Sequence, residues 1–251
     1  HPTRLSAHNF QLTQDLCRSY NATGITEDIY IPQNIQLMQA LRPDLQEIAV
    51  IGDCQFFGIY STLLVKKYLQ EYPSDLKFTF MDGRFLSTNT LYERLHHLSP
   101  NTGILLTGWM QDAEGYLYDH EKVHHNICQL APTPVFSVTD WGNNNIDYIG
   151  GYYAESFDYG VLLSELALRV LGGVPAKAIP LQSNTQALGV HINETLLEAN
   201  HLNIGNCNTS RLYFYNRPPT FWTKHRTLLL LCGGSLGGGI LIYLVIFTSL
   251  R

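Results

Sequence analysis

Short apolar runs alternate with longer segments of helical periodicity along most of this chain. The runs that predict β-strands are 47–53, 77–83, 102–109, 133–141 and 147–153. The segments between them repeat apolar residues at helical spacing, as Phe57, Leu64 and Tyr68 do after the first run. Strands that alternate with helices of this length form βαβ crossovers. The pattern therefore predicts an α/β domain, built as a doubly wound parallel sheet with helices on both faces.

Three further helices are expected at 88–98, 114–130 and 157–173. In the last of them, large apolar side chains share one face, and two glycines follow that face. These residues are Tyr159, Leu162, Leu163, Leu166 and Val170, then Gly172 and Gly173. Such a face is expected to pack against a core, and glycine is a common helix stop.

The closing segment, Thr227–Leu250, is predominantly apolar and contains no charged residue. About 20 such residues are enough for a helix to cross a bilayer. Aromatic and basic residues precede the segment, as interfacial anchors do: Phe221, Trp222, Lys224, His225 and Arg226. We therefore expect a transmembrane helix at 227–250. The alternative is a buried core helix, although globular helices seldom run this far without a polar face.

Glycines in the middle of this segment form two GxxxG pairs. The pairs are Gly233 with Gly237 and Gly234 with Gly238. This spacing lets two membrane helices approach closely, so we expect a homodimer that packs through this face. The alternative is that the glycines are simply tolerated, because glycine is more frequent in spanning helices than in soluble ones.

Composition narrows the function further. The net charge of −5 and the lack of a basic block argue against nucleic-acid binding. No P-loop, GxSxG or HExxH motif is present, so the sequence predicts no cofactor and no catalytic machinery in this chain. The histidines that could suggest a metal site are His96, His97, His120, His124 and His125. A solvated helix face over 116–130 is the favoured interpretation. The five cysteines have no metal-site spacing, and free thiols are favoured over one disulfide.

The ends of the predicted strands carry the candidate binding residues. In open α/β sheets, ligands bind where loops gather at the carboxyl ends of the strands. An aspartate or a tryptophan stands at several of these ends. The ligand-binding candidates are Asp53, Phe56, Asp82, Trp109, Asp140, Trp141 and Tyr152. Aromatic platforms beside a few polar groups are typical of a small-molecule cleft. The alternative is that each Asp caps a helix and each Trp only packs.

Three stretches carry a family resemblance. They are YNATGITEDIYIPQNIQLMQALRPDLQEIAVIGD (20–53), YIGGYYAESFDYGVLLSELALRVLGGVPAKAIPL (148–181) and LGVHINETLLEANHLNIG (188–205). Their order and spacing resemble those of ABC-transporter substrate-binding proteins with the type I periplasmic-binding fold, in the branch that includes aromatic amino-acid binders. The combination carries the resemblance, because no single motif is specific.

The resemblance implies two lobes with a ligand between them. Residues 1–45 then hold the tail of the first lobe and the crossover, and 46–205 form the second lobe. Residues 206–226 are a juxtamembrane linker before the predicted span. The implied ligand is a small organic compound, an aromatic amino acid or a relative of one. The family's free binding proteins lack a carboxy-terminal span, so the chain is similar to the extracytoplasmic part of a bacterial membrane sensor, often a histidine kinase.

Three functions follow as expectations. The first is a ligand-sensing receptor in the bacterial inner membrane, with residues 1–226 extracytoplasmic and the span carrying the signal to an inner module. The second is a membrane-tethered binding component of an ABC transporter. The third is a membrane-anchored α/β enzyme, which the missing catalytic motifs disfavour.

Overall fold

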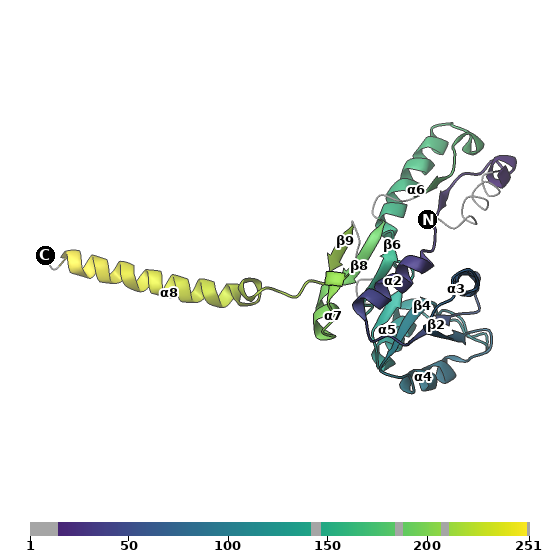
Figure 1. The fold of residues 1–251 in the computed structure, drawn as a ribbon. Helices are drawn as coiled ribbons and strands as arrows, with labels where there is room; N and C mark the ends of the chain where they lie inside the picture. Colours follow the sequence, from purple (N-terminus) through teal and green to yellow (C-terminus); the bar gives the residue numbers. More distant parts are fainter. Residues whose placement is uncertain (1–14, 142–146, 184–187, 207–210, 250–251) are drawn as a thin grey trace. The chain divides into compact units, whose positions relative to one another are not determined.

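The computed structural model of the chain describes residues 15–141, 147–183, 188–206 and 211–249. The chain divides into two compact units, His1–Asn216 and Arg217–Arg251. The first unit contains the main sheet, and the second consists mainly of one long helix (Figure 1).

A seven-stranded sheet forms the centre of the first unit. Its strands are β2 (Glu47–Gly52), β3 (Lys77–Asp82), β4 (Thr102–Gly108), β5 (Val135–Ser137), β6 (Gly150–Tyr153), β8 (Gly189–Asn193) and β9 (Leu212–Tyr215). Their spatial order is β3-β2-β4-β5-β6-β8-β9. Neighbours are parallel except for β6 and β8, which are antiparallel. The predicted mainly parallel sheet is thus confirmed, and β9 lies in the segment that the sequence assigns to a linker.

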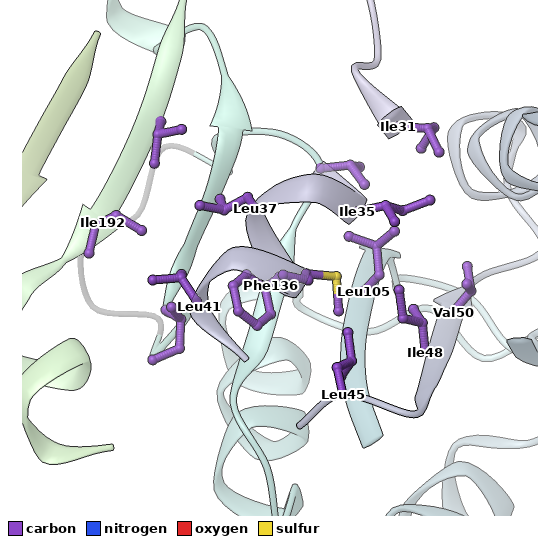
Figure 2. Close-up of a cluster of buried hydrophobic side chains, with 14 of the residues drawn as sticks. Ile31, Ile35, Leu37, Leu41, Leu45, Ile48, Val50, Leu105, Phe136 and Ile192 are labelled. Atoms are coloured by element: carbon purple, nitrogen blue, oxygen red, sulfur yellow. The ribbon is translucent and has the colours of Figure 1, made fainter. Parts of the chain in front are cut away.

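Helices cover both faces of this sheet, as a doubly wound pattern requires. They are α2 (Ile31–Leu41), α3 (Phe56–Glu71), α4 (Thr88–His96) and α5 (His120–Leu130), with the short α7 (Glu194–Ala199) after β8. Side chains alternate along β2: Ile48 and Val50 join the core cluster that contains α2, whereas Ala49 and Ile51 join the one that contains α4 and α5. Figure 2 shows the first cluster, where Phe136 of β5 lies among the leucines of α2.

The helix α5 begins at His120, six residues later than the start of the predicted segment 114–130. Asp119 caps it, because its side chain accepts a hydrogen bond from the backbone N–H of Lys122 at 3.1 Å. Upstream, Gly115 has a φ of +81°, in the region that glycine adopts most readily. The residues between β4 and α5 therefore form a loop at the carboxyl edge of the sheet.

The helix α6 (Ser156–Leu171) differs from the prediction of a core-packed face. Leu166 is its one buried residue, whereas Leu163 and Val170 of the predicted face are 58% and 40% exposed. Near it lies a small second sheet, in which β1 (Ile25–Thr26) pairs in parallel with β7 (Gln182–Ser183), after the short helix η1 (Ala176–Ala178). Among the described residues, the predicted core-facing stripe is thus buried at Leu166 and half-buried at Tyr159 and Leu162, and it is exposed at its other positions.

The second unit consists mainly of α8 (Phe221–Ser249). The sequence predicts a membrane span over 227–250. Of the helices in the described part of the chain, none is both long and apolar enough to cross a bilayer, so the predicted span is not found there. In the predicted packing face, the side-chain environments of Gly233, Gly234 and Gly237 lie outside the described residues, and no heavy atom lies within 4 Å of a Cβ placed on Gly238.

Candidate functional site

Asp53 follows β2 and is buried. Its Oδ2 accepts a hydrogen bond from the backbone N–H of Met110 at 2.9 Å, and its Oδ1 accepts one from that of Gln55 at 3.1 Å. Burial raises the pKa of this carboxyl above its usual range, although the backbone hydrogen bonds oppose the rise. A Cβ at Gly58 would collide with the carboxylate. Asp53 therefore links the loops after β2 and β4. Its role in this structure is to hold these loops together, and it does not line the pocket that contains Trp141.

Asp82, at the end of β3, is held by Arg84. The Arg84 Nη2 donates to Oδ2 at 2.6 Å and the Nε donates to Oδ1 at 3.0 Å. Burial opposes ionisation of Asp82, but the hydrogen bonds and charge of Arg84 outweigh it and lower the pKa of the carboxyl. The guanidinium in turn lies 5.3 Å from the ring centre of Phe85. This pair belongs to the exposed rim of the sheet.

Trp109 is fully buried in the core on the α4 and α5 side. Its Nε1 donates to Thr88 Oγ1 at 2.9 Å, and its backbone N–H donates to His124 Nε2 at 3.0 Å. The other ring nitrogen of His124, Nδ1, lies 2.5 Å from the Tyr148 hydroxyl. Trp109 therefore packs inside the protein and presents no surface to a ligand in this structure. The expectation of a solvated histidine face is wrong at His124, which is fully buried.

Trp141 takes a different position, on the wall of a pocket. Its ring meets Phe57 edge-on at 5.7 Å and His124 at 4.9 Å between ring centres. The indole Nε1 is buried and has no hydrogen-bond partner among the described residues. An unpaired buried donor costs about 1–3 kcal/mol, so the position of this ring is held against an energetic cost.

The pocket has a volume of about 460 Å³ and lies where the chain leaves β5 and β6. Such volumes are in the range of small-molecule sites, about 300–1,000 Å³. Its walls combine aromatic, hydroxyl and acidic side chains. They are Thr139, Asp140, Trp141, Tyr148, Tyr153, Glu155, Ser156, Phe157, His191 and Tyr215. Asp140 and Trp141 are the two sequence candidates that the structure brings together here.

Asp140 also positions the start of α6. Its Oδ2 accepts from the backbone N–H of Ser156 at 2.8 Å, and the Ser156 hydroxyl donates to its backbone carbonyl at 2.8 Å. The capping and binding interpretations of Asp140 are thus compatible, because a carboxylate can accept several hydrogen bonds at once.

Two of the lining residues, Tyr153 and His191, belong to a stack of three rings. His191 of β8 lies between Tyr153 and Tyr213, 4.7 Å from each ring centre and nearly parallel to both. Its Nδ1 is 3.4 Å from Glu155 Oε1. The strands can approach because Gly150, opposite Ile192 in β8, has a φ of +141° and no room for a Cβ.

The two remaining candidates lie elsewhere. Tyr152 points to the opposite face of β6 from Tyr153, where its ring meets Tyr30 edge-on at 5.3 Å. Phe56 is 83% exposed at the start of α3 and stacks on Tyr60. Neither lines the pocket.

Several exposed or pocket residues escaped sequence reasoning. Glu155 and His191 line the pocket, and Phe85, Tyr116 and Phe157 are exposed near the carboxyl ends of strands. Phe85 and Phe157 could have been found from the sequence, because each is an aromatic residue that follows shortly after a predicted strand. No sequence pattern pointed to His191, because its strand β8 joins the sheet from a distant part of the chain. Among the described residues, no group of three His, Cys, Asp or Glu side chains is placed to hold a metal ion.

Comparison with known proteins gives fold-level neighbours. No protein-family model and no curated protein sequence matches the chain. Among solved structures, it resembles an ABC domain from Streptococcus pneumonia in complex with L-Trp, with a TM-score of 0.55, 15% identity, and coverage of 76% of this chain and 62% of that one. It also resembles the ligand-free, open structure of a substrate-binding protein with adhesive properties from Clostridium difficile, with a TM-score of 0.54, 12% identity, and coverage of 78% and 63%.

A third neighbour is a conserved domain protein from Vibrio cholerae, with a TM-score of 0.53, 15% identity, and coverage of 72% of this chain and 58% of that one. The chain thus spans about three fifths of the length of each neighbour. At these identities the likeness shows the fold alone. The substrate-binding-protein fold implied by the sequence is confirmed at that level, and no comparison bears on a histidine kinase.

Proposed function

We propose that this chain forms one wall of a cleft that binds a small organic ligand, in a protein built like the periplasmic substrate-binding proteins. The observation that carries the proposal is the pocket after β5 and β6, where Asp140 and Trp141 meet the residues that open α6. Open α/β sheets bind ligands at the carboxyl ends of their strands, where this pocket lies.

An aromatic amino acid or a related compound is the proposed ligand class. Trp141 places an aromatic residue on the pocket wall, and the pneumococcal neighbour was solved with L-Trp. The fold likeness supports this choice only in general terms, so the ligand is to be found by screening.

The test is calorimetric titration of the full-length protein with a panel of amino acids, aromatic amines and aromatic acids. Replacing Trp141 with Ala should weaken binding of the best ligand by about tenfold, the loss expected for one well-placed aromatic contact. Trp222→Ala is the matched control, because Trp222 is exposed in the other unit. Thermal melting shows whether each variant stays folded. Binding of no compound, or equal binding by both variants, would reject the proposal.

A finer proposal concerns the setting of the domain. The uncharged apolar sequence at 227–250 supports a membrane-attached protein with residues 1–226 extracytoplasmic. In a sensor the segment would carry the signal inward to an output module. In the alternative, a tethered component of an ABC transporter, it would only anchor the binding domain.

A further inference from the structure

The pocket that Asp140 and Trp141 share is acidic. Asp140 and Glu155 both line it, and the Glu155 side chain is 47% exposed. Beyond them, Thr139 Oγ1 donates to Glu27 Oε1 at 2.6 Å, which places a third carboxylate behind the wall. None of the described lining residues is Lys or Arg, and His191 is the one basic side chain among them.

Aromatic rings supply most of the remaining surface. Tyr153 is stacked on His191, and Trp141, Tyr148 and Tyr215 complete the walls. The negative face of an aromatic ring attracts cations, and this attraction strengthens where water is excluded. A carboxylate next to such rings adds a charge-assisted hydrogen bond for an N–H donor.

The pKa of the Tyr153 hydroxyl depends on the charges that surround the pocket. Burial raises its pKa well above the ordinary value, and the neighbouring Tyr215, Asp140 and Glu155 raise it further. The carboxylates of Asp140 and Glu155 therefore disfavour a further negative charge at this position, although burial alone disfavours a charge of either sign.

We infer that this pocket receives a positively charged group of the ligand, a primary or quaternary ammonium, between the carboxylates of Asp140 and Glu155 and the aromatic walls. The inference rests on the proposed ligand-binding function and adds the charge of the ligand to it. Ammonium-bearing compounds should bind more tightly than otherwise identical compounds without the ammonium.

Matched ligands test this in the full-length protein. L-tryptophan and indole-3-propionate differ only in the ammonium group, and tryptamine lacks only the carboxylate of L-tryptophan. Any other compound that the panel identifies is compared in the same way with its analogue that lacks the ammonium group. We expect the ammonium-bearing member of each pair to bind at least tenfold more tightly, with an affinity that falls as salt is raised from about 50 to 500 mM because screening weakens partly exposed charges.

Glu155→Gln removes a charge and keeps the side-chain shape. It should weaken binding of the amine about tenfold and leave binding of any deaminated compound unchanged. Glu165→Gln, an exposed change of the same kind on α6, is the matched control and should have no effect. Asp140→Asn, which can still accept from Ser156, should act like Glu155→Gln.

The outcomes separate the two proposals. Equal binding of the ammonium-bearing and deaminated members, with no loss in Glu155→Gln, would overturn the inference and leave the proposed function standing. Binding by no compound of either kind would overturn both.

Discussion

His124 lies on a helix face that the sequence assigns to solvent, yet it is fully buried. Its Nε2 accepts the Trp109 backbone N–H, and its Nδ1 meets the Tyr148 hydroxyl. Burial, and then the charge of His120, lower the pKa of His124 to about 3. The ring is therefore neutral in the folded protein at neutral pH.

This residue should make stability depend on pH. The unfolded chain binds a proton at His124 near pH 6.5, whereas the folded protein does so only near 3. The contribution of neutral His124 to the free energy of unfolding is therefore fully present above about pH 6.5. It is lost as pH falls toward 3, by at most about 1.4 kcal/mol per pH unit. Urea unfolding between pH 7.5 and 4.5 measures this slope.

His124→Gln should flatten that dependence, because glutamine can accept from Trp109 and carries no titrating group. His125→Gln is the matched control on the same helix, where the side chain is half exposed. If both variants keep the wild-type slope, the neutral buried state of His124 is not the source of the pH effect.

At the scale of elements, α6 is the least covered helix of the first unit. Leu163, Leu168 and Leu171 are largely exposed, and the short β1–β7 sheet lies near the helix. The second lobe that the family resemblance implies is the surface that we expect to cover these side chains. Covering a leucine stabilises a protein by about 1.5–3 kcal/mol.

The test is a charged substitution on this face in the full-length protein. Leu168→Glu should lower the free energy of unfolding by about 2 kcal/mol or more, because a covered leucine would be replaced by a charge. Leu63→Glu on α3, where the leucine is half exposed, should change it by less than about 0.5 kcal/mol. Equal small effects would mean that nothing covers α6.

At the scale of the whole molecule, the question is whether the second unit attaches the first to a membrane. If 227–250 spans a bilayer, the full-length protein should remain in the membrane fraction after washing at high pH and high salt. Replacing Gly234 and Gly238 with Ile should weaken self-association in a cross-linking assay and leave insertion unchanged. Release into the soluble fraction would reject the membrane proposal, and unchanged association would reject the glycine interface.

The sequence by itself determined the alternation of strands and helices and the mainly parallel character of the sheet. The apolar run 47–53 predicted a buried strand, and the structure places Ile48 and Val50 on one face of it and Ala49 and Ile51 on the other. Helical spacing likewise located α3 and α4. It also pointed to Asp140 and Trp141, since residues just after a parallel strand lie at the edge where ligands bind.

Only the tertiary structure decided what each of these residues does. Trp109 and Trp141 each follow the carboxyl end of a parallel strand. Trp109 is nevertheless buried in the core with α4 and α5, whereas Trp141 lines a pocket. His191 reached that pocket because β8 pairs antiparallel with β6, a contact that no local pattern encodes. Periodicity reports which way a side chain points from its own element, whereas burial and neighbours depend on which distant element packs there.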